Sequence, residues 1–142
     1  MTAMTRHFGN DLPGMIVEPG RSLCGSAGVI QAEVVLIARK AASDHKRWVY
    51  LDIGKFGGLA ETMAESIKYP IVTERDGGAV GPVVLAGPTC DSADILYEKA
   101  QYLMPLDLEI GDKVEILSAG AYTASYASVG FNGFPPMKTY CI

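Results

Sequence analysis

The strongest constraint on the fold is a series of short apolar segments rich in β-branched residues and separated by turn residues. They lie at residues 29–39, 47–53, 83–86 and 114–117. In the second of these, Trp48 and Tyr50 alternate with Val49 and Leu51, which puts the two pairs on opposite faces of a strand. Gly and Pro pairs, such as Gly87-Pro88, follow or separate the segments. The pattern predicts a mainly β fold with some helix.

The remaining segments give weaker signals. Leu59, Met63 and Ile67 recur at helical spacing, so a short helix is expected over residues 59–68. Residues 2–8 read as the end of a helix, and Met15-Ile16-Val17 as a short strand that runs into a Pro-Gly turn. Residues 95–103 are ambiguous, and residues 120–134 read as a loop or helix packed against another element. One β/α piece followed mostly by strands predicts a compact β-barrel or sandwich attached to the edge of something larger.

Composition narrows the class of protein. The 142 residues are enough for one domain, and a net charge of -4 argues against nucleic acid or an anionic membrane as the main partner. No apolar run approaches the roughly 20 residues needed to cross a bilayer, and residues 1–10 lack the apolar segment of a signal peptide, so a cytoplasmic location is expected. A mean hydropathy of +0.18 is high for a free-standing domain and indicates a buried interface, a missing partner domain or a well-filled core.

The three cysteines are Cys24, Cys90 and Cys141, an odd number at wide spacings. They form neither a disulfide framework nor a zinc-binding pattern. We therefore expect no bound metal and three reduced thiols. Cys90 lies in Gly87-Pro88-Thr89-Cys90-Asp91-Ser92, where a thiol beside an acid could donate a proton or act as a nucleophile. The alternative is a small buried Cys in a turn whose Asp91 accepts backbone hydrogen bonds.

Other polar groups also suggest binding. The turn Glu18-Pro19-Gly20-Arg21 carries an arginine that can hold a phosphate with two parallel hydrogen bonds, and Ser22 could cap a following helix. The alternative is a surface turn with an incidental ion pair. Tyr122 could bind an anion or fill the core with its hydroxyl satisfied locally. Glu61 and Glu65, one helical turn apart, could recognise a cationic substrate or form a solvated helix face.

The order of four motifs along the chain resembles that in the ornithine/lysine decarboxylases. The motifs are the turn at 18–21, the Cys90 segment, Gly120-Ala121-Tyr122-Thr123 and Phe131-Asn132-Gly133-Phe134. This family has an alanine-racemase-like fold, with an N-terminal β/α barrel and a C-terminal β-domain. The resemblance runs from about Met15 to the C-terminus. It implies that residues 1–28 are the remnant of the barrel, with its last helix and strand, and that residues 29–142 are the C-terminal β-domain, a β-barrel or sandwich.

The resemblance also implies a cofactor, pyridoxal 5′-phosphate. Glu18 would pair with its pyridine nitrogen, which keeps the ring protonated and able to accept electrons when the substrate loses carbon dioxide. Arg21 and the backbone around Pro19 and Gly20 would bind its phosphate, and Tyr122 would add a hydrogen bond to the same phosphate.

The substrate side of the active site is implied in the same way. Cys90 would protonate the α-carbon that is left as a carbanion when carbon dioxide is lost, giving the amine, and Asp91 would contact the distal ammonium of a basic amino acid. Both would serve the active site of the opposite subunit, so a homodimer is expected. Glu65 falls nearest to the family's acidic position in the helix that sets substrate length, and Glu61 is the second choice. A diaminopimelate decarboxylase would be expected to carry Glu after the Cys, whereas this chain carries Asp91.

The family's cofactor-bearing lysine and ring-stacking histidine lie on early barrel strands and have no counterpart here, since every lysine follows Glu18. The first hypothesis is therefore a C-terminal fragment of an ornithine/lysine decarboxylase, an enzyme that makes putrescine or cadaverine for polyamine biosynthesis, with no activity alone. The second is a non-catalytic regulatory or dimerisation module of the same family. The third is a small β-domain with an unrelated role and coincidental motifs.

Overall fold

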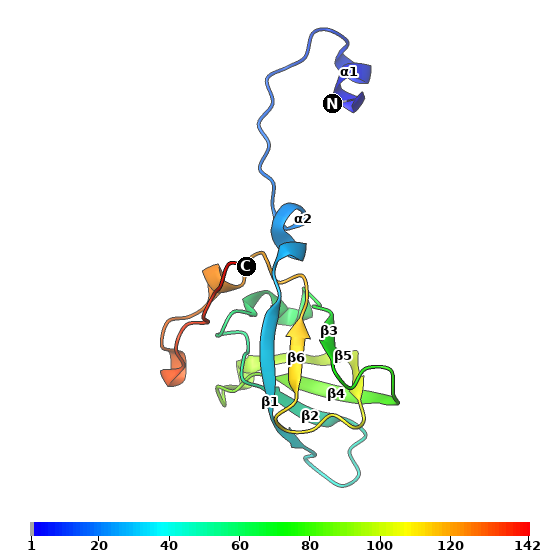
Figure 1. Ribbon diagram of the computed structural model, residues 1–142, viewed down its shortest axis with the longest axis vertical. Coiled ribbons are helices and arrows are strands. Elements are labelled where there is room, and N and C mark those ends of the chain that lie inside the picture. Colours follow the sequence, from blue (N-terminus) through cyan, green and yellow to red (C-terminus); the bar gives the residue numbers. More distant parts are fainter. Residues whose placement is uncertain (1) are drawn as a thin grey trace.

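The computed structural model describes residues 2–142, which form one six-stranded sheet and several short helices (Figure 1). The strands are β1 (Ile30–Ala38), β2 (Arg47–Leu51), β3 (Ile71–Thr73), β4 (Val80–Ala86), β5 (Ile95–Pro105) and β6 (Lys113–Ile116). The α-helices are α1 (Thr2–Phe8) and α2 (Arg21–Cys24). The 3-10 helices are η1 (Gly25–Ala27), η2 (Ala60–Glu65), η3 (Ser92–Asp94), η4 (Ala124–Tyr126) and η5 (Phe131–Gly133). The strand order β3-β6-β1-β2-β4-β5 confirms the predicted mainly β fold.

Strand β1 curls the sheet, because its two halves have different neighbours. Its first half pairs with β6, from Ile30 opposite Ile116, and its second half pairs with β2, up to Ala38 opposite Trp48. The register with β2 shifts between Val34 and Leu36, and an irregularity of this kind bends a strand and increases its twist. The result is a half-barrel whose concave side holds the core.

The core confirms the two faces predicted for β2. Val49 and Leu51 are fully buried in the main cluster, together with residues of β1, β4, β5 and β6, and Ile71 of β3 packs against it. Trp48 points to the other face, where it packs with Val84 of β4 in a smaller cluster. The ammonium of Lys40 lies 3.7 Å from the centroid of the Trp48 ring and covers this outer face. Both faces of β2 are therefore buried, which explains why it reads as an almost continuous apolar segment.

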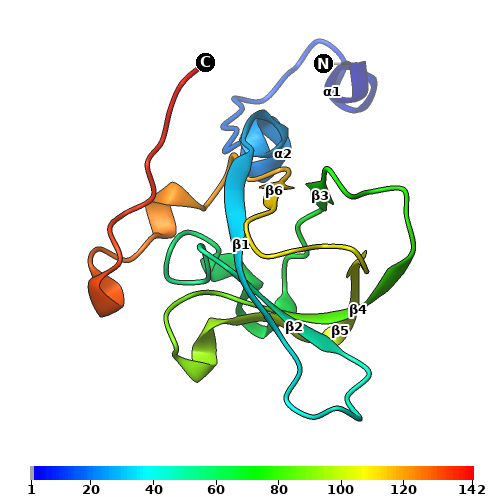
Figure 2. The same ribbon diagram turned by 60° about the horizontal axis from the view of Figure 1, so that its bottom comes forward.

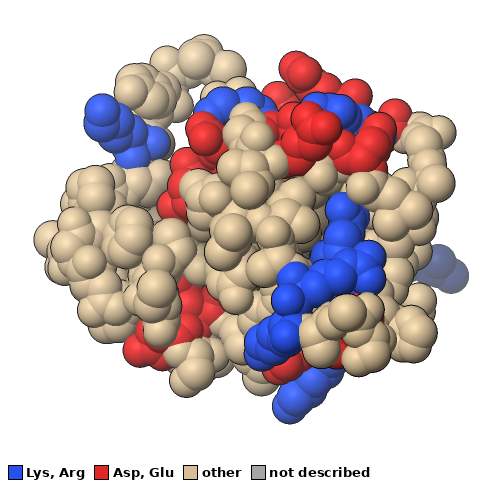
Figure 3. Space-filling model, turned by 90° about the horizontal axis from the view of Figure 1, so that it is seen from below, with Lys and Arg blue, Asp and Glu red and all other residues tan. Residues whose placement is uncertain are grey.

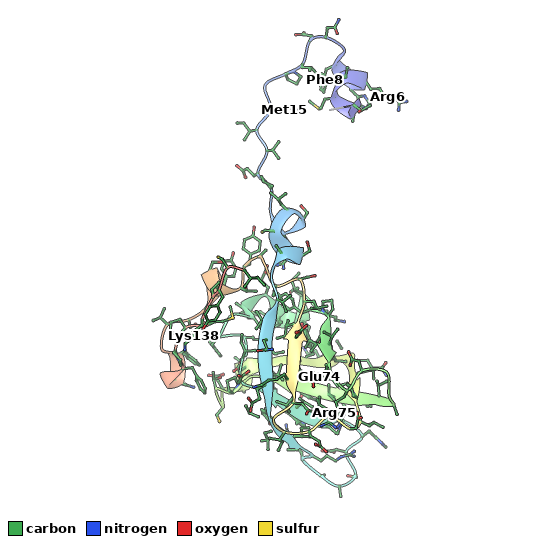
Figure 4. The ribbon with its side chains drawn as sticks, in the orientation of Figure 1. Arg6, Phe8, Met15, Glu74, Arg75 and Lys138 are labelled. Atoms are coloured by element: carbon green, nitrogen blue, oxygen red, sulfur yellow. The ribbon has the colours of Figure 1, made fainter. Side chains whose placement is uncertain are left out.

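The segment before α2 differs from the expectation. Met15-Ile16-Val17 forms no strand, and Ile16 is 93% exposed. In Figure 4 the chain around Met15 runs as an extended arm between α1 and α2, with its side chains in open space. A strand needs a neighbour to bond its backbone groups, and none of the described strands lies beside this segment. The strand predicted here is therefore wrong for this structure, and α2 begins directly after Gly20, with Ser22 inside the helix rather than capping it.

The helix predicted over residues 59–68 is also wrong. The segment contains only the short 3-10 helix η2, which is broken where Met63 takes an extended conformation and Ala64 a positive φ of 52°. Leu59 is buried but Met63 is exposed, so the apolar residues at helical spacing do not form one buried helix face. The ambiguous residues 95–103 lie in β5, and residues 120–134 are loops with two single 3-10 turns.

Charged side chains of both signs share one face of the molecule. Figure 3 views the end where β1 turns into β2, and basic side chains lie together there beside separate acidic groups. Arg75 pairs with Glu109 at 3.1 Å and with Asp112 at 3.0 Å, which joins the turn after β3 to the turn before β6. None of the helices formed by residues 2–142 has the length and apolar character that crossing a bilayer requires.

Candidate functional site

Two glycines whose backbones touch bring α2 against the segment that follows β6. A β-carbon on Gly120 would lie 2.9 Å from the Gly28 nitrogen and even closer to the carbonyl oxygen of Cys24. The Ala119 N–H donates to the Gly28 carbonyl at 2.8 Å, and the Gly120 N–H donates to Gly25 at 2.9 Å. Because any side chain on Gly120 would separate these backbones, glycine is required for the approach.

The approach of these segments brings together three of the residues that sequence reasoning assigned to phosphate binding. A β-carbon on Gly20 would lie 3.5 Å from the Tyr122 hydroxyl oxygen. The guanidinium carbon of Arg21 lies 5.6 Å from the centroid of the Tyr122 ring, within the range of a cation–π contact. We call the meeting point of Gly20, Arg21 and Tyr122 the anion corner.

Glu61 and Tyr69 lie beside Arg21, and sequence reasoning gave neither a role there. Glu61 was considered only as a substrate ligand, but it forms an ion pair with Arg21, 40 residues away in sequence. The bond from Glu61 raises the pKa of Arg21 against the opposing effect of burial, and Tyr69 adds to the rise. The Tyr69 hydroxyl is near Arg21 without the geometry of a hydrogen bond, and it has no partner among residues 2–142.

The Cys90 loop, residues 87–94, is anchored by a buried acid that sequence reasoning left without a role. Asp94 is 1% exposed, and its carboxylate accepts bonds from the Lys55 N–H at 2.7 Å, the Thr89 N–H at 3.2 Å and the Thr89 hydroxyl at 2.7 Å. Gly54 and Gly87 leave room for it, since a β-carbon on either would collide with the carboxylate. A buried carboxylate needs such bonds, so it fixes the loop against the segment after β2.

Within this loop, Cys90 and Asp91 are both exposed. Cys90 has a positive φ of 57°, a conformation that costs energy for any residue but glycine. One carboxylate oxygen of Asp91 accepts a bond from the Ala93 N–H at 2.7 Å and caps η3, and the other makes no bond to a described residue. The thiol and one carboxylate oxygen are therefore available to a ligand.

The Phe131-Asn132-Gly133-Phe134 segment supports the same loop. The Asn132 side chain donates to the Thr89 carbonyl at 2.8 Å. The Phe131 ring stacks on Phe56, with centroids 3.9 Å apart. Two of the sequence motifs therefore lie side by side, although 38 residues separate them in the chain.

Glu65 is occupied by the protein's own backbone. Its carboxylate accepts bonds from the N–H groups of Glu98 at 2.8 Å and of Lys99 and Ala100 at 2.7 Å. Burial alone would raise the pKa of Glu65, but these three bonds outweigh it and hold the pKa below its usual value. The substrate-binding role of Glu65 stays a prediction, and the geometry favours a structural role in which Glu65 joins η2 to β5.

Glu18 and Pro19 stand apart from these contacts. Both are exposed on the extended arm, and Glu18 makes no hydrogen bond or ion pair with a described residue. Its assignment to a ring nitrogen stays a prediction.

The anion corner and the Cys90 loop are also in different places. Figure 2 shows α2 at the top and the yellow-green segment between β4 and β5 at the left, beneath the orange C-terminal segment.

A largely apolar cavity of about 920 Å³ lies between the sheet and the C-terminal segment. Its walls include Gly28 and Gly120 from beside the anion corner, Thr89 from the Cys90 loop, and Phe131 and Met137 from the C-terminal segment. Within residues 2–142, no three His, Cys, Asp or Glu side chains come together as metal ligands would. The cavity's largely apolar lining suits the carbon skeleton of an organic molecule.

Backbone strain marks the same residues. Cys90, Tyr122, Glu65 and Asn132 all have positive φ angles, between 50° and 57°. Such conformations cluster at binding and catalytic sites, where the surrounding structure holds them. Positive φ does not by itself separate binding residues from structural ones here, because Ala64 and Ser118 also have it.

The residues of the anion corner fit the phosphate end of a phosphorylated cofactor. Arg21 offers a charged fork and Tyr122 a hydroxyl beside the Gly20 backbone. The curled six-stranded sheet defines the chain as a β-domain with this corner at one end. Residues 21–120 match the model described as the C-terminal sheet domain of pyridoxal-dependent decarboxylases. The chain belongs to this family of pyridoxal-dependent decarboxylases.

Named relatives agree with this assignment. The lysine/ornithine decarboxylase of Selenomonas ruminantium is 33% identical over 136 residues, 94% of this chain and 33% of that protein. A diaminopimelate decarboxylase of Staphylococcus aureus (strain COL) is 34% identical over 85% of this chain and 28% of its own length. The chain spans about a third of the length of the curated relatives it matches.

Solved structures share the fold. The lysine/ornithine decarboxylase of Vibrio vulnificus complexed with cadaverine is 39% identical, with a TM-score of 0.70 over 84% of this chain and 31% of that one. The arginine decarboxylase of Paramecium bursaria Chlorella virus is 28% identical, with a TM-score of 0.76 over 94% of this chain and 35% of that one. These relatives act on different basic amino acids, so the family is fixed more closely than the substrate.

Proposed function

We propose that this chain supplies the C-terminal side of the active site in a decarboxylase for ornithine or lysine, assembled as a homodimer. The observation that carries the proposal is the anion corner, where Gly20, Arg21 and Tyr122 meet although Tyr122 is a hundred residues from Arg21 in the chain. Vibrio vulnificus lysine/ornithine decarboxylase structures with cadaverine and with putrescine support the substrate class.

In this proposal the residues of the corner bind and orient the cofactor. Arg21 and Tyr122 hold its phosphate, and Glu18 keeps its ring nitrogen protonated. Pyridoxal phosphate, when bound, accepts the electrons that remain after the substrate loses carbon dioxide. The chain's own contribution at this end is therefore position and charge, and Arg21 is the main source of both.

The Cys90 loop has the complementary role at the substrate end. The Cys90 thiol delivers its proton to the substrate's α-carbon after carbon dioxide leaves. The free oxygen of Asp91 pairs with the distal ammonium of the substrate, and its short side chain suits a plain amine better than the amino acid end of diaminopimelate. Because the loop and the corner lie on different parts of the chain, we assign them to two active sites, each completed by a second copy.

The test is complementation. The 142-residue chain is mixed with the barrel portion of the Selenomonas ruminantium lysine/ornithine decarboxylase, and decarboxylation of ornithine, lysine and diaminopimelate is measured. We expect turnover of ornithine or lysine, and its loss in the Arg21→Met variant. Turnover of diaminopimelate alone would overturn the substrate assignment. Association without any turnover would favour the non-catalytic module, and absence of association would count against both.

A further inference from the structure

We propose that the Tyr69 hydroxyl is a further phosphate-binding group of the anion corner, beside Arg21 and Tyr122. The inference rests on the proposed function, because it takes the cofactor's phosphate as the ligand. Tyr69 is 2% exposed, and its hydroxyl oxygen is buried with no hydrogen-bond partner among residues 2–142. Buried hydroxyls in folded proteins nearly always have a partner, so this one indicates a missing ligand.

The backbone of Tyr69 is fixed by two other tyrosines. The Tyr69 N–H donates to the Tyr97 hydroxyl at 2.9 Å, and the Tyr102 hydroxyl donates to the Tyr69 carbonyl at 2.8 Å. The rings of Tyr97 and Tyr102 are stacked, with centroids 4.9 Å apart. A binding group needs a rigid support of this kind, because its hydroxyl must be in position before the ligand arrives.

The neighbouring charge of Arg21 selects an anion as the ligand of Tyr69. Its hydroxyl lies near the Arg21 guanidinium, which now pairs with Glu61. A phosphate monoester carries the same sign of charge as the Glu61 carboxylate and offers more acceptor oxygens. It can therefore replace the carboxylate on Arg21 and accept a bond from Tyr69 with another oxygen. Glu61 then holds Arg21 in place while no phosphate is bound.

Tyr69→Phe tests this role cleanly, because it removes a hydroxyl that bonds nothing within the described chain. The 142-residue chain is titrated with pyridoxine 5′-phosphate, which lacks the aldehyde that would react with surface lysines, and with pyridoxine as the phosphate-free control. We expect pyridoxine 5′-phosphate to bind about tenfold more weakly to Tyr69→Phe, as for loss of one bond to a charged group. Pyridoxine binding and the midpoint of urea unfolding should be unchanged.

Two further variants separate the possible outcomes. Tyr102→Phe removes a hydroxyl that does bond the chain, so its urea midpoint should fall and show that the assay detects a structural hydroxyl. If Tyr69→Phe keeps wild-type affinity while Arg21→Met loses it, the role of Tyr69 is refuted and the anion corner stands. If Arg21→Met also binds normally, or the wild type binds no phosphate, the corner itself is refuted. A lower midpoint for Tyr69→Phe with unchanged affinity would make its hydroxyl structural.

Discussion

The carboxylate of Glu65 accepts a hydrogen bond from the backbone N–H of Ala100 at 2.7 Å, across 35 residues of sequence. With the neighbouring N–H groups of Glu98 and Lys99, this bond fixes η2 to the middle of β5. Glu65→Gln keeps the size of the side chain but offers one acceptor oxygen to three donors. We expect it to lower the free energy of unfolding at pH 7 by about 1–3 kcal/mol.

The pH dependence of that difference provides a second check. The pKa of Glu65 is lowered in the folded chain, so its contribution is present above the unfolded value, about 4.3, and is lost as the pH falls through the folded value. Urea unfolding of the wild type and of Glu65→Gln should therefore differ at pH 6 to 8 and converge in acid. Glu115→Gln, on the exposed face of β6, is the matched control. A difference that grew in acid would contradict the assigned role.

Gly120→Ala should separate the two segments that form the anion corner. Its β-carbon would lie 2.9 Å from the Gly28 nitrogen, and backbone atoms cannot move aside as a flexible side chain can. We expect a loss of about 1–3 kcal/mol of stability, together with weaker binding of pyridoxine 5′-phosphate. Calorimetry and the same titration measure both. Gly78→Ala, whose β-carbon would meet nothing closer than 3.9 Å, should change neither.

Cys90→Ser should separate chemistry from folding. The thiol is exposed and makes no hydrogen bond with the described chain, so the free energy of unfolding should change by no more than about 0.5 kcal/mol. In the enzyme assembled with a barrel domain, loss of a positioned proton donor should lower the decarboxylation rate by about 10² to 10⁴. Cys141→Ser, another exposed thiol, should leave the rate unchanged. Equal rates for the two variants would remove Cys90 from the mechanism.

Glu61→Gln should release Arg21 for an external anion. The ion pair with Glu61 now competes for the guanidinium, so removing its charge should tighten binding of pyridoxine 5′-phosphate several-fold, by about 1 kcal/mol or less for a partly exposed pair. Glu74→Gln is the charge-matched control, because Glu74 follows β3 and Figure 4 shows it well below α2. Weaker binding in Glu61→Gln would mean that Glu61 orients Arg21 rather than competing for it.

Sequence reasoning succeeded where a local pattern determines structure. β1 and β2 follow from β-branched residues and strict alternation, and the faces of Trp48 and Val49 came out as expected. It failed over residues 59–68, where Leu59, Met63 and Ile67 have helical spacing. There the hydrogen bonds that the Glu65 carboxylate accepts from β5 stabilise a kinked 3-10 segment instead. Tertiary contacts therefore override the local preference.

The candidate site shows the same division. The order of the motifs indicated Arg21, Tyr122 and Cys90 as candidates, and the structure brings Arg21 and Tyr122 together while the roles of all three stay predictions. Nothing in the sequence pointed to Asp94 as the anchor of the Cys90 loop or to the pair of Arg21 with Glu61, because both depend on contacts between residues far apart in the chain. Tyr69 could not be singled out either, because its distinguishing property is a buried hydroxyl without a hydrogen-bond partner, which only the structure shows.

One half of strand β1 pairs with β6 and the other half with β2, so β1 joins all six strands into one hydrogen-bonded unit. Heat or denaturant should therefore melt all six strands in a single step. A molecule that binds the folded domain near α2, at one end of β1, must then raise the free energy of unfolding of the whole domain, including the distant Cys90 loop. A ligand at the anion corner would in this way also protect the Cys90 loop from unfolding.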